Sequence, residues 1–325
     1  MTPTATSLFS GGGGDTEGMT QAGLRVVMAA NHSPVAIATH RANHPRTHSV
    51  VANLLETDFN DFPRTNFCWV SASCRGHSPG NNQKPLSMVE ERQRKDPASI
   101  DRATAFAMLE ATDIHRYDAV IMENVPEFRN WVLFPMLVDG MALLRYRFQE
   151  VMLNAADVGP NPVAQNRKRW FGVFTPDGNV DLSLPATIRT PATAILEPDL
   201  GKLVTRRMYI TPQIEEITER NVPHLVVYRK HAHAQRADEN QLATVTAGGN
   251  HHAIATLTRN GPVQRLLNNR ERARAQGFPR DYRFCGTPKE ELLQIGNAVP
   301  VNVARFLAVR VAEALGMANE LEMAA

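Results

Sequence analysis

The stretch that decides the fold class is LFSGGGGDTEGMTQAG, residues 8–23. Its first residues complete the apolar run TSLF (6–9), which predicts a strand, and its glycines precede Gly18, Ala22 and Gly23 at a spacing that suits a helix. Four glycines in a row are more often a flexible linker, but a linker needs no such pattern after it. Glycines in a strand-to-helix turn let the backbone approach a ligand closely. The segment therefore predicts a ligand-binding turn of an α/β fold.

The alternation continues as far as about residue 176. Strand-like apolar runs alternate with stretches of helical spacing, which favours a Rossmann-like, doubly wound parallel sheet with ligands beyond the carboxyl ends of its strands. The further strands are expected at 24–30, 67–72, 117–125 and 169–176, and the helices at 33–45, 101–116 and 133–148.

After residue 177 the alternation stops. Repeated prolines separate segments without a clear period, and 244–258 resembles β-structure interrupted by a Gly-Gly loop. Helical spacing returns over 288–315. We therefore expect residues 1–176, completed by 286–325, to form the α/β domain. Residues 177–285 should form a smaller, irregular, β-rich domain, with about 177–262 as its variable part.

Composition limits the classes of function. With 43% apolar and 21% charged residues the chain has globular composition, and it contains no run of 18 apolar residues. Its three cysteines include no Cys-x-x-Cys pair, so we expect a soluble, unexported, cytoplasmic protein without structural zinc or other metal. The net charge is only +2, but the basic segments gather in the second half. They are either solvated faces or the contact surface for a polyanion.

Three polar sites follow or precede predicted strands. Cys74 ends the run FCWVSASC and is either a small core residue or a nucleophile held out to react. Glu123 and Asn124 end the strand that contains MENVP, where a glutamate is often a solvated cap. In QNRKRWFGVF, alternation places Gln165, Arg167 and Arg169 on one side of a strand, although an exposed edge would look the same.

Taken in order, these motifs resemble the cytosine-5 DNA methyltransferases. The Gly-rich turn, Ser-Cys, Glu-Asn-Val and Gln-x-Arg-x-Arg are followed by RERARAQGFP (270–279) and IGNAVP (295–300). The resemblance covers nearly the whole chain except about 177–262, where this family has its variable target-recognition domain. It implies a transferase that uses S-adenosylmethionine to methylate C5 of cytosine in double-stranded DNA.

The resemblance also assigns catalytic roles. Cys74 would add to C6 of the cytosine so that C5 becomes nucleophilic. Glu123 would bind N3 and the exocyclic amine, while Asn124 would brace the nearby loop. Arg169 would contact O2 of the base, with Arg167 supporting it. The base must be flipped out of the duplex, and the loop at 75–85 would close over it.

The donor site follows the family only in part. The family places Glu and an aromatic residue against ribose and adenine, whereas this chain has His32 and Ser33, and Ser73 and Arg75 replace the usual Pro and Gln around the cysteine. Asp58 is a rival to Asn53 near the adenine. The residues expected at the donor are Phe9, Gly11, Gly13, Gly14, Asn31, His32, Asn53, Asn297 and Val299.

The expected partner is double-stranded DNA, bound by a monomer. Two alternatives remain: a transferase acting on tRNA with the same catalytic fold, and a catalytically idle DNA-binding homologue. Membership of a restriction-modification system, a phage or a host is left open. The residues expected to contact DNA are Ser78, Gln165, Thr244, Thr246, Asn250 and His251.

Overall fold

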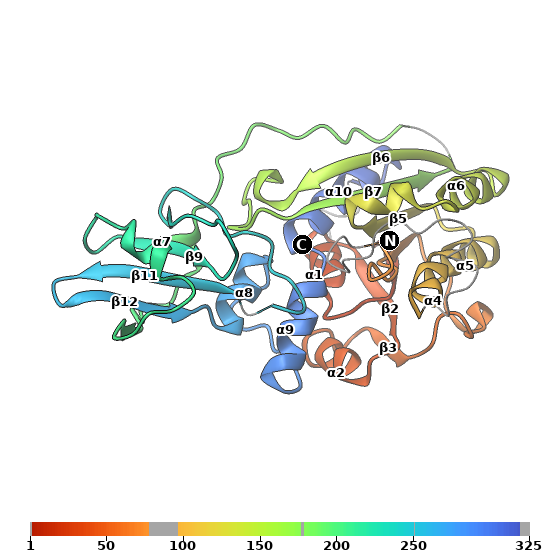
Figure 1. Cartoon of the computed structure of the whole chain (residues 1–325). Helices are drawn as coiled ribbons and strands as arrows, with labels where there is room; N and C mark the ends of the chain where they lie inside the picture. Colours follow the sequence, from red (N-terminus) through yellow and green to blue (C-terminus); the bar gives the residue numbers. More distant parts are fainter. Residues whose placement is uncertain (1, 78–96, 177–178, 250, 319–325) are drawn as a thin grey trace. The chain divides into compact units, whose positions relative to one another are not determined.

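The chain folds into two units. The computed structural model describes residues 2–77, 97–176, 179–249 and 251–318 (Figure 1). Unit 1 comprises Met1–Leu153, Lys168–Ser183 and Val303–Ala325, and unit 2 comprises Asn154–Arg167 and Leu184–Asn302. The stretch Asn154–Arg167, which the sequence placed within the α/β domain, thus packs with unit 2.

Unit 1 is built on a sheet with the strand order β3-β2-β1-β4-β5-β7-β6. Its neighbours from β3 to β5 are parallel, which confirms the doubly wound architecture. Strand β7 runs antiparallel to β5, a direction that the alternation of strands and helices did not predict. The segment between β6 and β7 contains no α-helix to carry a parallel crossover. The strands are β1 (Thr4–Leu8), β2 (Arg25–Asn31), β3 (His48–Val51), β4 (Phe67–Val70), β5 (Ala119–Asn124), β6 (Arg147–Asn154) and β7 (Lys168–Thr175).

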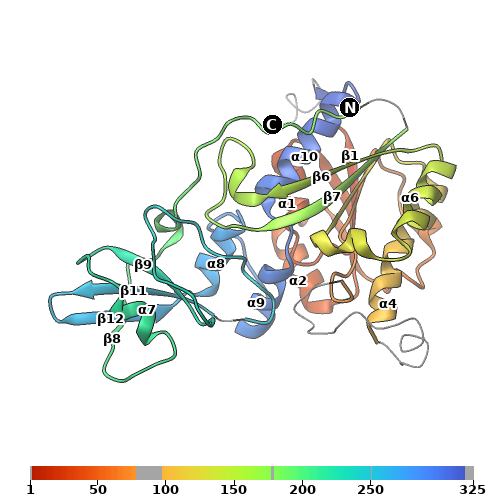
Figure 2. The same ribbon diagram turned by 45° about the horizontal axis from the view of Figure 1, so that its top comes forward.

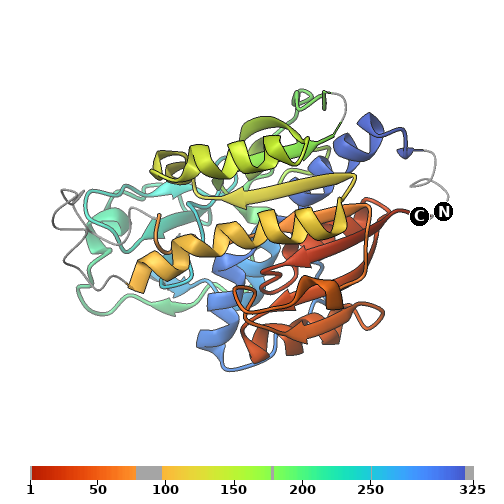
Figure 3. The same ribbon diagram turned by 90° about the vertical axis from the view of Figure 1, so that its right-hand side faces the viewer.

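Helices cover both faces of this sheet. On one face, α5 and α6 contribute Met108 and Met141 to the same core cluster as Leu8 of β1. On the other, Ser7, which points away from Leu8, donates a hydrogen bond to Asp15 of α1. Figure 3 shows α4 and α5 almost in line, with α6 beside them. The helices are α1 (Gly14–Gln21), α2 (Pro34–Asn43), α4 (Pro97–Ala103), α5 (Ala107–His115), α6 (Phe134–Leu143) and α10 (Val301–Ala314).

Two predicted helices of this unit have different bounds. The helix expected over 101–116 is interrupted at Thr104–Phe106, where a 3-10 turn forms and the Thr104 hydroxyl donates to the Asp101 carbonyl at 2.6 Å. The helix expected to reach residue 148 ends at Leu143 instead. Arg145 has a positive φ of 72°, which stops the helix and lets β6 begin two residues later.

Unit 2 contains a smaller antiparallel sheet with the strand order β10-β9-β11-β12-β8 (Figure 2). Its two later helices begin with capping boxes, Asn268 with Glu271 and Thr287 with Glu290, which satisfy their first backbone N–H groups. The strands are β8 (Lys202–Leu203), β9 (Pro223–Val227), β10 (Gln235–Arg236), β11 (His252–Thr258) and β12 (Gly261–Leu266), and the helices are α7 (Thr211–Glu215), α8 (Asn269–Ala275) and α9 (Pro288–Asn297).

The segment Pro288–Ala314 passes a length and composition test for a membrane span, but 67% of its apolar window is buried inside the protein. It is also divided, because α9 ends at Asn297 and α10 begins at Val301. These properties are those of core helices. Within the described parts of the chain, no three His, Cys, Asp or Glu side chains gather as a metal site.

Candidate functional site

The polar residues singled out in unit 1 follow three neighbouring parallel strands. The Gly-rich turn follows β1, Cys74 follows β4, and Glu123 and Asn124 end β5. The carboxyl ends of parallel strands meet at one edge of a sheet, where α/β folds bind their ligands. The sheet order therefore brings the predicted donor turn and the predicted catalytic side chains to one edge of one unit.

Cys74 lies in a braced segment just beyond β4. It is half-buried, and its carbonyl accepts a hydrogen bond from the His77 backbone N–H at 3.0 Å. The preceding Ser73 donates from its hydroxyl to an Asp101 oxygen at 2.9 Å. Asn124, which is fully buried, donates to the Ala72 carbonyl at 3.2 Å and so ties the end of β5 to this segment. The expected bracing role of Asn124 has a geometric basis.

Glu123 and Arg169 form an ion pair. The Arg169 Nε lies 3.3 Å from Glu123 Oε1, and the two side chains are 15% and 9% exposed. Glu123 lies on β5 and Arg169 on β7. These two strands pair antiparallel, and this pairing brings Arg169 beside Glu123. Burial weakens the competition of water for both groups, so this pair is a preorganised donor and acceptor set.

The donor turn has the backbone that its glycines predict. Gly11 and Gly13 have φ of 51° and 84°, a region open chiefly to glycine, and Gly13 is the N-cap of α1, whose first residue is Gly14. Phe9 also has a positive φ, 62°, which is uncommon for a bulky residue and typical of a functional turn. The buried hydroxyl of Ser10 has no hydrogen-bond partner among the described residues. A buried polar group without a partner suits a site that receives a polar ligand.

The residues after β2 and β3 are more open. Asn31 is buried and its side-chain oxygen accepts from the Ser33 N–H at 2.9 Å, while the Ser33 hydroxyl caps α2. His32 between them is exposed, so its ring is free to meet a ligand. Asn53 is exposed as well, and Asp58 caps the 3-10 helix η1 (Phe59–Asp61) through the Asn60 N–H.

A carboxyl group is buried beneath the donor turn. Asp15 of α1 is 1% exposed and accepts a hydrogen bond from the Ser7 hydroxyl. Burial, more than any other influence, raises the pKa of Asp15 to about 6, and the charge of Glu123 adds to the rise. The sequence had not singled out this residue, since nothing in the local pattern distinguishes a buried aspartate from a capping one.

Gln165 and Arg167 are internal residues of unit 2. Gln165 is fully buried, and its amide donates to the Ala275 carbonyl and to Gln276 Oε1, each at 3.0 Å. Arg167 is 3% exposed and donates to the Val245 carbonyl, also at 3.0 Å. The expectation that Gln165 contacts DNA is corrected here, because its hydrogen-bonding atoms are already used inside the unit.

The other residues predicted to contact DNA lie in unit 2 where the structure describes them. Thr244 donates to the Asn166 carbonyl at 2.8 Å, and Thr246 is half-buried. His251 lies 3.3 Å from Arg229, a residue that the sequence did not single out, and burial lowers the pKa of the histidine. Ser78 and Asn250 lie outside the described residues. Asn297, exposed at the end of α9, and the buried Val299 both belong to unit 2.

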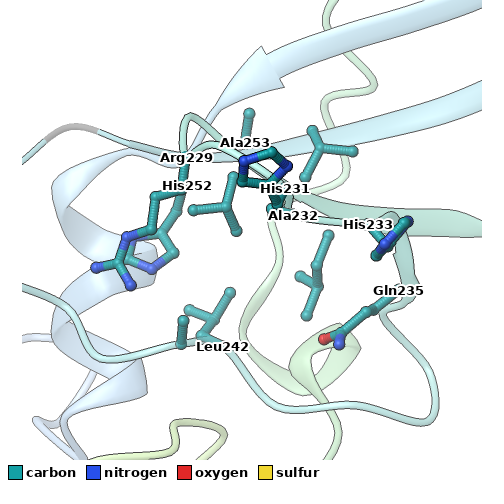
Figure 4. A pocket seen from close by; sticks show the side chains of 12 residues that line it. Arg229, His231, Ala232, His233, Gln235, Leu242, His252 and Ala253 are labelled. Carbon is teal, nitrogen blue, oxygen red and sulfur yellow. The ribbon is translucent and has the colours of Figure 1, made fainter. Parts of the chain in front are cut away.

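Arg229 lines a pocket of about 320 Å³ at the ends of β9 and β11. Figure 4 shows Arg229 and His252 on one side of this pocket and His233 and Gln235 on the other. The pocket adjoins the segment in which the sequence placed DNA recognition, and the guanidinium of Arg229 in its lining suits an anionic partner.

Residues 4–313 match the family described as C-5 cytosine-specific DNA methylase. The chain belongs to this family. The match spans both units and includes the donor turn, Cys74 and the Glu123–Arg169 pair. The fold class and the enzyme class expected from the motif order are thereby confirmed, whereas the roles of individual side chains stay predictions.

Known relatives of this DNA methylase cover nearly all of it. The type II methyltransferase M.NgoPII of Neisseria gonorrhoeae is 26% identical, with 95% of each chain covered. The type II methyltransferase M.HgiDI of Herpetosiphon aurantiacus is 28% identical, with 93% of this chain and 91% of the relative covered. Among solved structures, the Entamoeba histolytica methyltransferase EhMeth has a TM-score of 0.71 at 14% identity, covering 97% of this chain and 99% of the other. At that identity the likeness supports the fold alone.

Proposed function

We propose that this DNA methylase transfers a methyl group from S-adenosylmethionine to C5 of cytosine in double-stranded DNA, through a covalent bond between Cys74 and C6 of a flipped-out base. The observation that carries the proposal is the Glu123–Arg169 ion pair at 3.3 Å, on strands β5 and β7. It offers a carboxyl and a guanidinium group in the unit that carries Cys74 beyond the adjacent strand β4.

The chemistry needs a nucleophile because C5 of cytosine is a weak one. The Cys74 thiolate forms a bond to C6, and the C5–C6 double bond supplies the electron pair that makes C5 nucleophilic. S-adenosylmethionine, when bound, supplies an electrophilic methyl group. After C5 has gained the methyl group, a base removes the C5 proton, the C5–C6 double bond re-forms and the thiolate leaves.

The other residues stabilise and position the base. Glu123 would donate a hydrogen bond from its protonated carboxyl to N3 and accept one from the exocyclic amine, and so stabilise the negative charge that develops on the ring as the thiolate adds. Arg169 turns a guanidinium N–H toward O2, and Asn124 holds the Cys74 segment through the Ala72 carbonyl. Extrusion of the base costs about a few kcal/mol. Ser78 would contact a phosphate beside the extruded nucleotide.

The donor would occupy the turn after β1. Phe9, Gly11, Gly13 and Gly14 form its backbone cradle, and Ser10 offers the unpartnered hydroxyl described above. The remaining donor contacts fall to residues after β2 and β3 and to the segment that follows α9, namely Asn31, His32, Asn53, Asn297 and Val299. His32 gives one neutral donor and one acceptor where a carboxylate would give two acceptors.

DNA sequence is read, on this proposal, by Thr244, Thr246, Asn250 and His251 in unit 2, with Arg229 of the adjoining pocket as a cationic contact. Unit 2, with about 177–262 as its variable part, is the target-recognition domain, and the enzyme works as a cytoplasmic monomer. Hydroxyl, amide and imidazole groups can all hydrogen bond base edges in the major groove. A module of this kind favours duplex DNA over tRNA, which remains the alternative substrate.

The test is methyl incorporation by the purified chain. Isotopically labelled S-adenosylmethionine is offered with duplex DNA of mixed sequence or with total tRNA, and the product is digested to nucleosides. Labelled 5-methyldeoxycytidine from DNA supports the proposal. Label in tRNA alone would favour the RNA substrate, and no label in either polymer at saturating donor would favour an idle DNA-binding homologue.

A further inference from the structure

The backbone N–H and carbonyl of one residue of unit 2 are both held by side chains from a distant part of the sequence. Val245 is fully buried, and its backbone N–H donates to Gln165 Oε1 at 2.6 Å. Its carbonyl accepts from Arg167 Nη1 at 3.0 Å. Val245 belongs to no strand, yet its backbone N–H and carbonyl both have hydrogen-bond partners. These partners are two residues of the Gln-x-Arg-x-Arg motif, about eighty positions earlier in the chain.

The two gripping side chains are themselves fixed. The Gln165 amide is anchored to the C-terminal end of α8 through Gln276, which in turn donates to the Ile295 carbonyl of α9 at 2.7 Å. Arg167 donates its second nitrogen, Nη2, to the Gly296 carbonyl at 3.0 Å. A planar guanidinium can reach two carbonyls at once, which a lysine ammonium on a flexible stem does not reproduce.

A third contact comes from the backbone of α9. A Cβ atom built on Gly296 would lie 2.3 Å from the Ala247 nitrogen and 2.4 Å from the Thr246 carbonyl carbon, far inside van der Waals contact. The glycine of IGNAVP thus lets the helix touch the segment Thr244–Gly249. This segment, here called the gripped loop, ends two positions before His251 in the sequence.

We propose that Gln165 and Arg167 are positioning residues that set which DNA sequence is methylated, by holding the gripped loop through Val245. The inference rests on the proposed function, in which Thr244, Thr246 and His251 read DNA. Hydrogen bonds to base edges require their donors and acceptors within about 0.5 Å of the productive geometry. Backbone pairing with the motif segment ends at Leu242, which bridges Gln165. Beyond it, the backbone of Val245 is held by side chains, so the geometry of the loop depends on them.

The test compares two unrelated ways of loosening the loop. Arg167→Lys keeps the charge and removes the two-carbonyl fork, whereas Gly296→Ala changes no polar group and pushes the loop backbone away. The matched control is Arg274→Lys in the same unit. Arg274 also donates from two nitrogens to a carbonyl, but that carbonyl belongs to Ile195, and its further partner is Glu197, so its bonds support another part of the unit.

Each enzyme methylates duplex DNA in which the bases around a cytosine are randomised, and bisulfite sequencing gives the rate at every sequence. Thermal melting of each variant is recorded in parallel. We expect Arg167→Lys and Gly296→Ala to lower the ratio of preferred to singly mismatched sites by about tenfold, the size of one base-pair mismatch. Arg274→Lys should lower the melting temperature and leave the ratio unchanged.

Thr246→Ala and His251→Ala separate this inference from the proposed function. If these two alter the site preference while Arg167→Lys and Gly296→Ala lower only the melting temperature, the positioning role is overturned and the DNA activity stands. If the wild type methylates no DNA at all, the proposed function itself fails. A change of preference in Arg274→Lys equal to that in Arg167→Lys would also overturn the role, because it would then reflect general loosening of unit 2.

Discussion

Replacing the buried carboxyl group of Asp15 by an amide should stabilise unit 1 at alkaline pH. Burial raises the pKa of Asp15 from its ordinary 3.8 to about 6. One pKa unit is worth about 1.4 kcal/mol, so the charged side chain should lower the free energy of unfolding by about 3 kcal/mol at pH 8. Asp15→Asn removes that penalty and keeps an oxygen that can accept the hydrogen bond of Ser7.

The sign of the pH dependence follows from the raised pKa. Below about pH 3 the carboxyl is protonated in the folded and the unfolded chain alike, and the folded state carries no penalty. The penalty grows as the pH rises toward 6 and is complete above it. The stability gain of Asp15→Asn should therefore be small at pH 4, about half a kcal/mol, and rise to about 3 kcal/mol at pH 8.

The assay is urea denaturation between pH 4.5 and 8 without donor, followed by tryptophan fluorescence. Trp69, Trp131 and Trp170 are the three tryptophans of the chain and all lie in unit 1. The control is Asp58→Asn, because a backbone hydrogen bond from Asn60 lowers the pKa of Asp58, so this variant should show no gain that grows with pH. A difference between Asp15→Asn and the wild type that is constant across this range would refute the reasoning.

Two further outcomes are expected at the edge of the sheet. His32→Glu should tighten binding of S-adenosylmethionine by about tenfold, since a carboxylate accepts two charge-assisted hydrogen bonds from ribose. The dissociation constant is measured by calorimetric titration at several pH values across the range where imidazole titrates. Loss of binding would mean that His32 makes a specific contact of another kind. Glu123→Gln should lower kcat by about 10² to 10³, as removal of one preorganised group does at other transition states. The rate of methyl transfer is measured in single-turnover experiments, and the affinity for DNA, which should be unchanged, is measured alongside. A rate within a factor of two of the wild type would contradict the role of Glu123.

The alternating part of the fold was predictable because its signals are local. Buried apolar runs such as 67–72 and the glycines of 8–23 report their own structure, and the predicted strands correspond to β1, β2, β4, β5 and β7. The short strand His48–Val51 was not predicted. It has four residues, and His48 and Val51 are both exposed, so it shows no clear alternation of apolar and polar residues. The direction of β7 was missed because pairing direction depends on the connection, not on the strand itself.

The candidate site divides in the same way. Motif order identified Cys74, Glu123 and Arg169, and the ion pair at 3.3 Å agrees with that choice. Nothing local distinguishes Gln165 from Arg169, although one is buried against α8 and the other pairs with Glu123. Contacts across about eighty residues or more, such as those of Val245, leave no trace in a single sequence.

The most direct measurement of the central claim is capture of the covalent adduct. Duplex DNA that contains 5-fluorocytosine is incubated with the enzyme and S-adenosylmethionine, and the mixture is examined by denaturing electrophoresis and peptide mass mapping. Fluorine cannot leave C5 as a proton does, so the wild type should remain bonded to DNA through Cys74. Cys74→Ser should bind the same DNA without forming the adduct, while Cys68→Ala and Cys285→Ala should form it. An adduct in Cys74→Ser, or one mapped to another residue of the wild type, would contradict the account.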